Sequence, residues 1–201
     1  MPPKIPKGTI VTLSDEQLTS LADIVSTRID ATLKPREEFV DKRLDNLQAE
    51  NDLLKEKTDD LEQRNRLENL RVFGIPEKSN EDTDQLVIDL AKKLNVTLEK
   101  SHISRSHRVG RKNGEKPRAI IVKFVSYASR QKMFMAKKQL KGTGTSIKED
   151  LTQIRQNILR KASENFDEVW SQNGVIIIKD GEDYHRIRTV RKLNELIGTE
   201  D

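Results

Sequence analysis

Two stretches decide the fold of this chain: ENLRVFGIP at residues 68–76 and KPRAIIVKF at residues 116–124. In the first, Leu70 and Val72 alternate with Arg71 and Phe73 before Gly-Ile-Pro ends the strand, and the second is the strongest β signal in the sequence. A helical stripe lies between them and comprises Leu86, Val87, Leu90, Ala91 and Leu94. A weaker strand at residues 103–109, a helix starting at Ser126 or Ser129, and a short edge strand at residues 145–147 complete the order β-α-β-β-α-β.

This order predicts a four-stranded sheet with its first and third strands side by side at the centre. RNA-recognition domains read RNA with those two strands, usually by stacking bases on aromatic side chains. Here the alignment places Ala119 and Ile121 at the positions of the usual aromatics, and Arg71 replaces the aromatic of the first strand. Because base stacking is then mostly missing, we expect binding to depend on phosphates.

The positive charge of the chain is concentrated in one block. The formal net charge is only +4, yet residues 100–142 carry thirteen Lys and Arg against one acidic residue. Such a block favours a polyanion as partner, bound with little sequence preference and strong salt dependence. The candidate nucleic-acid contacts are Arg71, Arg105, Arg108, Arg111, Lys112, Lys116, Arg118, Lys123, Lys137 and Lys138.

The N-terminal arm predicts a parallel coiled coil. A Ser14/Gln17 capping box opens an amphipathic helix, which we expect Pro35 to interrupt as the first residue of a new helix. Beyond it, leucine or valine recurs every seven residues, and three of four g–e′ pairs in a parallel register are opposite in charge. The candidate oligomerisation residues are Val40, Leu44, Leu47, Asn51, Leu54 and Leu61. This pattern leaves dimer and trimer open.

The C-terminal residues 148–201 predict a small α+β lobe. Asp150 or Thr152 caps a helix, a hairpin turns at Asn173-Gly174, and a last helix starts at Thr189. We expect Trp170 to lie in the core rather than to form a stacking platform. A second basic wall is a weaker expectation, and its candidates are Arg155, Arg160, Lys161, Arg186, Arg188 and Arg191.

The complete prediction is an α+β chain of four parts. Residues 1–13 are expected to be disordered, residues 14–66 to form the helical arm and coiled coil, residues 67–147 the RNA-recognition-like domain, and residues 148–201 the C-terminal lobe. The chain has no cysteine, His102 and His107 lack acidic partners at ligand spacing, and Glu149-Asp150 is expected to cap a helix rather than hold magnesium. We therefore expect no enzyme activity, no cofactor and no metal. No apolar run approaches a membrane span, so no membrane partner is expected.

Several motifs in this order resemble the first-open-reading-frame proteins of LINE-type non-LTR retrotransposons. They are LENLRVFGIPE at residues 67–77, SHRVGR at 106–111, KPRAIIVKF at 116–124, IKEDLT at 147–152 and VWSQNG at 169–174. The resemblance covers about residues 36–197, and its strength is the common order of the motifs after a coiled coil. It implies a homotrimer, an atypical RNA-recognition domain, and a C-terminal domain that closes over the RNA, with Arg118 and residues 108–111 as the main contacts.

The expected function is therefore sequence-tolerant binding of single-stranded RNA and DNA. Members of the resembled family package their own transcript as a ribonucleoprotein and act as nucleic-acid chaperones, in cytoplasmic particles and also in the nucleus. The alternative is a coiled-coil scaffold whose degenerate RNA-recognition fold binds protein, because its stacking aromatics are missing.

Overall fold

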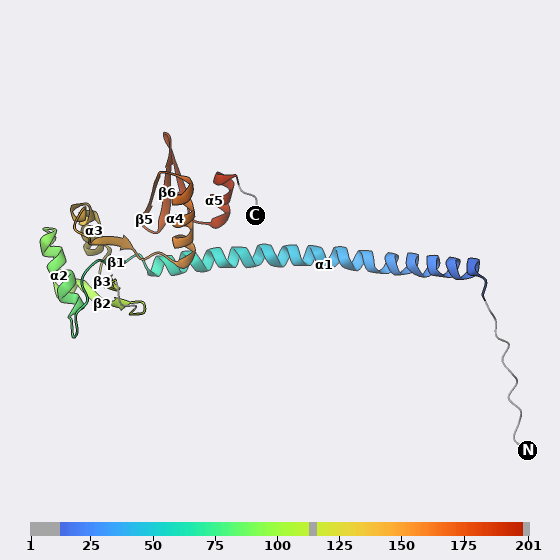
Figure 1. The fold of residues 1–201 in the computed structure, drawn as a ribbon, viewed down its shortest axis with the longest axis horizontal. Coiled ribbons are helices and arrows are strands. Elements are labelled where there is room, and N and C mark those ends of the chain that lie inside the picture. The colour runs from blue at the N-terminus through green and yellow to red at the C-terminus, as the bar shows by residue number, and fades with distance from the viewer. Residues whose placement is uncertain (1–12, 113–115, 199–201) are drawn as a thin grey trace, which may run out of the picture. The chain divides into compact units, whose positions relative to one another are not determined.

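A computed structural model describes residues 13–112 and 116–198 of the chain. The chain divides into two units, residues 1–54 and 55–201. The class is α+β, with one long N-terminal helix and two antiparallel sheets (Figure 1). Apart from Leu13, the segment expected to be disordered lies outside the described residues.

The first element is a single helix, α1 (Asp15–Asn65). Its start confirms the capping box, because the Gln17 backbone donates to the Ser14 hydroxyl and the Ser14 backbone donates to the Gln17 side chain. The predicted interruption at Pro35 is wrong, since the helix continues through it. Proline removes one backbone hydrogen bond, and good helix formers on both sides, such as Lys34, Arg36 and Glu37, outweigh that loss. No described helix is long and apolar enough to cross a membrane.

The predicted seam residues of α1 lie exposed on the single chain. The exposed fraction of the apolar members ranges from 47% for Leu47 to 64% for Leu61, and Asn51 is exposed as well. In contrast, Asp59 and Gln63 on the same helix are buried. A row of exposed leucines is the arrangement that a helical partner would cover.

The central domain has the predicted element order. Its elements are β1 (Asn69–Phe73), α2 (Thr83–Lys93), the 3-10 turn η1 (Lys100–His102), β2 (Ile103–Val109), β3 (Ala119–Phe124), α3 (Tyr127–Met135), the 3-10 turn η2 (Ala136–Leu140) and β4 (Ser146–Glu149). The sheet order is β2-β3-β1-β4, so the first and third strands are central, as predicted. Asp82 caps α2 and Ser126 caps α3.

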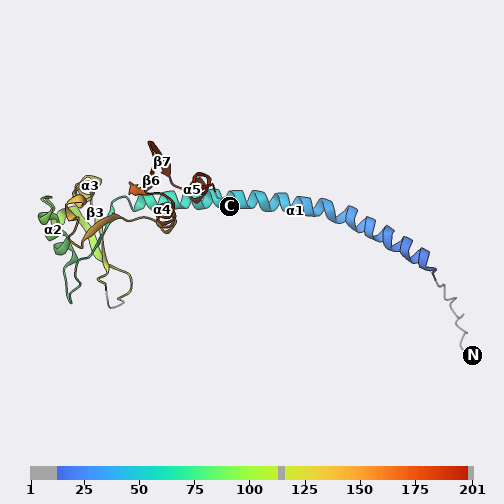
Figure 2. The same ribbon diagram turned by 45° about the horizontal axis from the view of Figure 1, so that its top comes forward.

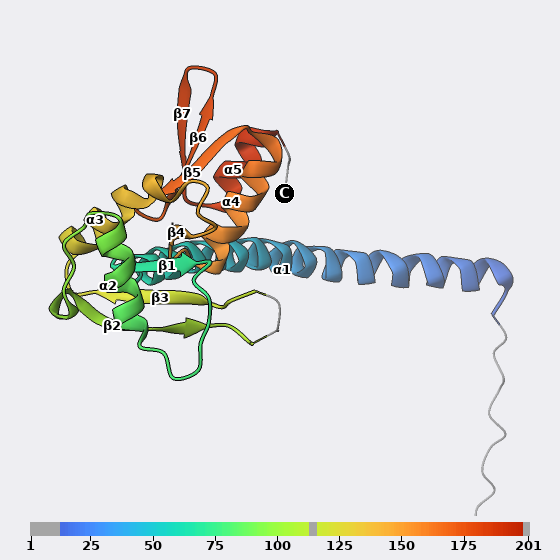
Figure 3. The ribbon, with the colours of Figure 1, turned by 60° about the vertical axis from the view of Figure 1, so that its left-hand side comes forward.

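One face of this sheet is buried under α2 and α3 (Figure 3). Leu70 and Val72 of β1 and Ile120, Val122 and Phe124 of β3 form the floor of this core. Val87, Leu90 and Ala91 of α2 and Met133 of α3 pack onto it. Because side chains alternate along a strand, the residues between these positions occupy the opposite, open face.

The C-terminal residues form a second three-stranded sheet with two helices (Figure 2). Its elements are α4 (Gln153–Asn165), β5 (Glu168–Gln172), β6 (Val175–Asp180), β7 (Asp183–Ile187) and α5 (Val190–Ile197). The Asn173-Gly174 turn is confirmed, with both residues at positive φ, as a two-residue hairpin of this type requires. The strand β7 was not predicted.

The placement of Trp170 contradicts the prediction of a core residue. Val169 packs into the core with Ile178, whereas Trp170 faces away and is 37% exposed. Its ring lies edge-on to the ring of Tyr184, with 6.3 Å between the centroids. Both Val169 and Trp170 are apolar, so the alternation of β5 alone could not indicate which face α4 and α5 would cover.

Glu149 and Asp150 do not cap a helix, which corrects a second prediction. Glu149 is the last residue of β4, and its carboxylate pairs with Arg130 of α3 while accepting hydrogen bonds from the backbone of Asn173 and Gly174 at 2.8 and 3.2 Å. The cap of α4 is Thr152. The strand thus runs two residues past the expected end at residue 147.

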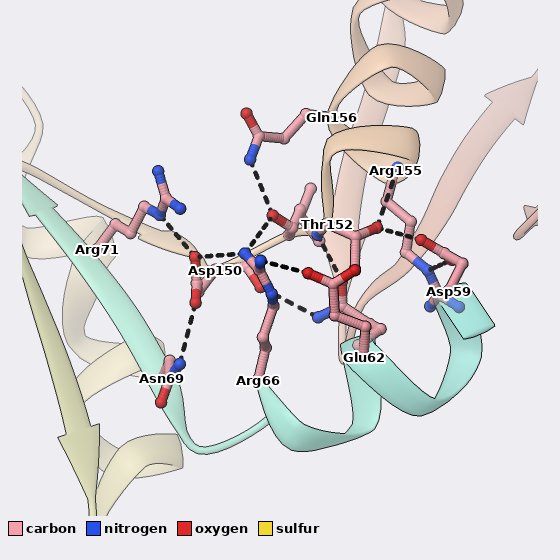
Figure 4. Close-up of polar contacts among 11 residues, drawn as sticks. Asp59, Glu62, Arg66, Asn69, Arg71, Asp150, Thr152, Arg155 and Gln156 are labelled. Carbon is pink, nitrogen blue, oxygen red and sulfur yellow. Dashed lines mark hydrogen bonds and ion pairs between the residues drawn. The ribbon is translucent and has the colours of Figure 1, made fainter. Parts of the chain in front are cut away.

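Asp150 faces the other way and joins the end of α1 to β1 (Figure 4). It accepts hydrogen bonds from Arg66, Asn69 and Arg71, at 3.3, 2.9 and 2.6 Å. The amide of Gln63 donates to the Asp150 carbonyl and accepts from the Thr152 backbone. The segment after β4 is therefore held along the last turns of α1.

We predict that Glu149→Ala will strongly destabilise residues 55–201. The Arg130 and Glu149 side chains are only 1% and 2% exposed. Removing one partner of a buried ion pair leaves an uncompensated charge, which typically costs about 3–5 kcal/mol. Urea unfolding at constant protein concentration measures the loss. Glu168→Ala, which breaks an exposed pair with Lys179, should leave the transition nearly unchanged. Equal effects of the two variants would contradict the prediction.

Candidate nucleic-acid interface

The open face of the central sheet is formed by the strand residues that alternate with the core residues. In the register of the strands, Arg105 of β2 lies opposite Lys123 of β3, and Lys123 lies opposite Asn69 of β1. In the neighbouring row His107 lies opposite Ile121, Ile121 opposite Arg71, and Arg71 opposite Lys148 of β4. Directly opposed residues on one face have Cβ atoms about 4.5–5.5 Å apart.

This face carries two like-charged pairs across strands, Arg105 with Lys123 and Arg71 with Lys148. Like charges directly opposite each other destabilise a sheet. No acidic residue occupies the open-face positions of the four strands, and Arg105, Lys123 and Lys148 form no ion pair within the described residues. The sheet therefore presents positive charge that the described chain does not neutralise.

Arg71 is only partly available to a ligand. Its Nε donates to Asp150 at 2.6 Å, and its side chain is 28% exposed. The Asp150 carboxylate reduces the repulsion between Arg71 and Lys148, and it fixes the position of the Arg71 side chain. Lys148 in turn lies over the ring of Phe73, with its Nζ 5.6 Å from the centroid.

Arg108 is placed on the helix side of the sheet and is fully engaged. Its guanidinium pairs with Glu81 at 2.7 Å and donates to the carbonyls of Ile75, Pro76 and Arg118. Only 4% of its side chain is exposed. Arg108 therefore fixes the loop after β1 against β2 and β3, and we remove it from the proposed ligand contacts.

Arg118 has a similar structural partner. Its guanidinium pairs with Glu77 at 2.6 Å, and its side chain is 28% exposed. This hydrogen bond lowers the pKa of Glu77 to about 2, from an ordinary value of 4.5. The hydrogen bond from Arg108 likewise lowers the pKa of Glu81. Two carboxylates before α2 thus hold two of the arginines expected to contact nucleic acid.

The remaining predicted contacts lie in two places. Arg111, Lys112 and Lys116 are exposed on the loop between β2 and β3, next to the undescribed residues 113–115. Lys137 and Lys138 lie on η2, whose Ala136 and Leu140 pack on the core, so the structure does not bring them to the open face. Lys137 lies 3.7 Å from the centroid of Phe134, and burial lowers its pKa.

Sequence reasoning missed two members of the face, Phe73 and Lys148. Phe73 alternates with Val72 and therefore shares the face of Arg71, which the pattern of β1 already implied. Lys148 was missed because β4 was expected to end at residue 147. His107, expected to be a strand residue, is exposed on the open face opposite Ile121. The described residues contain no cluster of His, Asp and Glu that could hold a metal ion.

No protein-family model and no curated protein matches the sequence of this chain.

We predict that Glu77→Gln will remove a pH-dependent part of the stability. Folding lowers the pKa of Glu77, so its ion pair with Arg118 stabilises the fold fully above about pH 4.5 and is lost as pH falls towards 2. The wild type should therefore be more stable than the variant at pH 6, and the difference should shrink between pH 4.5 and 2. Urea midpoints measured by circular dichroism at several pH values provide the check. A difference that stays constant across this range would contradict the assignment.

Proposed function

We propose that the chain binds single-stranded RNA and DNA through the open face of its central sheet, as a parallel homo-oligomer built on α1. The supporting observation is positive charge on this face that no carboxylate of the described residues neutralises: the like-charged contact Arg105–Lys123, and Lys148, whose neighbour Arg71 is already paired with Asp150. Proteins break a local stability rule of this kind most often at functional sites. A phosphate backbone crossing the strands would neutralise Arg105, Lys123 and Lys148.

The order of elements and the sheet order β2-β3-β1-β4 support an RNA-recognition type of domain for residues 67–147. The face has one aromatic side chain, Phe73, and Lys148 lies over its ring. Phosphate contacts then dominate, and binding is tolerant of sequence. The resemblance to LINE first-open-reading-frame proteins supports a transcript of the element as the ligand, which the chain packages as a ribonucleoprotein and remodels as a nucleic-acid chaperone.

A coiled-coil scaffold that binds protein is the second candidate. It is favoured by the internal roles of Arg108 and Arg118, which reduce the number of cations left for phosphate. A protein ligand would make a contact of weaker salt dependence than a polyanion. The following titration separates the two candidates.

We predict that Arg105→Ala/Lys123→Ala will weaken binding to single-stranded RNA of unrelated sequence at least tenfold. The change removes the unneutralised pair of the open face, and each lost phosphate contact lowers the salt slope of log K by about 0.7. Fluorescence anisotropy across a salt series measures both quantities. Stability should not fall, because the variant relieves a repulsion.

The matched control is Lys93→Ala/Lys100→Ala, which removes the same charge from exposed positions on α2 and η1. It should retain most of the affinity. If the two double variants bind equally well, the open face is not the site. If the wild type fails to bind at low salt, the scaffold replaces the proposal.

We predict that Leu54→Lys will dissociate or weaken the oligomer, whereas Leu53→Lys will not. Both leucines are exposed on α1, but only Leu54 lies in the heptad row, so a lysine there places charge in the seam. Sedimentation equilibrium of the full chain gives the mass of each variant. Equal masses for both variants and the wild type would argue against this seam.

A further inference from the structure

The outer face of the C-terminal sheet collects aromatic and cationic side chains. The face towards α4 and α5 is formed by Val169, Ile176, Ile178 and Ile187. On the opposite face, Trp170 lies opposite Ile177 and Ile177 opposite Arg186. Tyr184 occupies the next row, opposite Lys179. The chain contains a single tryptophan, and the structure exposes it here rather than in a core.

The geometry of the two rings suits a planar ligand. Trp170 and Tyr184 stand edge to face at an interplanar angle of 78°, with centroids 6.3 Å apart. The exposed fraction is 37% for Trp170 and 62% for Tyr184. This arrangement leaves ring surface open to solvent, and every nucleobase has a π-face that can stack on such a surface.

The charges on this face favour a polyanion that runs away from the hairpin tip. Lys179 is neutralised by Glu168 at 2.7 Å, and the tip carries Asp180 and Asp183. At the other end, Arg186 and Arg188 are exposed and form no ion pair within the described residues. Arg188 also lines a cleft of about 530 Å³ together with Lys57 and Arg64, and the acidic residue in its lining, Asp60, is paired with Arg155. Unneutralised positive charge thus extends from Trp170 towards this cleft.

We propose that Trp170 and Tyr184 stack on bases of a single-stranded nucleic acid whose phosphates lie along Arg186, Arg188 and Arg64. The inference rests on the proposed function and adds to it a second contact of different chemistry. The central sheet supplies phosphate contacts with little stacking, and the C-terminal sheet supplies the stacking that the central sheet lacks.

The fluorescence of Trp170 tests the inference directly, because no other tryptophan contributes to the signal. Titration of the full chain with a single-stranded oligonucleotide of unrelated sequence should quench Trp170. An abasic strand of the same length keeps the phosphates without the bases and should quench it much less. Arg105→Ala/Lys123→Ala should still show quenching at saturating oligonucleotide.

Variants give a second measurement that does not use the signal of Trp170. By anisotropy, Trp170→Ala and Tyr184→Ala should each weaken binding by about tenfold, within the range found when stacking side chains are truncated. Trp170→Phe retains a ring and should recover most of the affinity. Circular dichroism confirms that each variant is folded, as expected for exposed positions.

The results that overturn the inference differ from those that overturn the proposed function. Tight binding with an unchanged Trp170 spectrum and no effect of Trp170→Ala overturns the stacking and leaves the proposed function intact. Equal quenching by the abasic strand also overturns the stacking, as does a change of the Trp170 spectrum with protein concentration alone, which would place a second copy on this face. Absence of any binding by the wild type overturns both.

Discussion

Two consecutive carboxylates, Glu149 and Asp150, hold residues 55–201 together. Both are buried, and an isolated charge in such a place would be costly, so each requires fixed partners. Because they face opposite sides, Glu149 binds Arg130 and the Asn173-Gly174 backbone, while Asp150 binds Arg66, Asn69 and Arg71. One dipeptide thereby joins α3, the hairpin of the C-terminal lobe, the end of α1 and β1.

The same constraint determines which face of α1 stays free in its last turns. Asp59 accepts from Thr152 and Arg155, and Gln63 binds the backbone on both sides of Leu151. In the heptad, Asp59 and Gln63 are b and f positions, opposite the row that contains Leu54 and Leu61. The C-terminal lobe therefore contacts the b and f side of the last turns of α1, and in the proposed oligomer the leucine row would face the partner helices.

The sequence predicts the parts of this fold that depend on local patterns. The alternation around Leu70 and Val72, the Asn173-Gly174 turn and the Ser14 cap each act within a few residues, so each was found. The ion pairs were not predicted, because their partners lie far apart in the sequence. Arg108 and Glu81 are 27 residues apart, and Arg155 and Asp59 are 96 residues apart. The density of basic residues led to the prediction that Arg108 and Arg118 contact the ligand. Only the tertiary structure shows that each has an acidic partner. The prediction that Trp170 lies in the core was wrong for a related reason: neither face of β5 is polar throughout, so the strand alone does not show which face is buried.

The mechanism of the proposed binding depends on which basic side chains are already paired with carboxylates of the protein and which are not. Arg108, Arg118 and Arg130 are bound to internal carboxylates, so the density of positive charge in residues 100–142 overstates the charge offered to a ligand. A single open face with Arg105, Lys123, Lys148 and part of Arg71 would form few phosphate contacts and would release a strand readily. Several such faces on one oligomer raise the avidity without slowing the release of each face. In the proposed function, tight packaging with local exchange of strands would therefore result from weak individual contacts joined through α1.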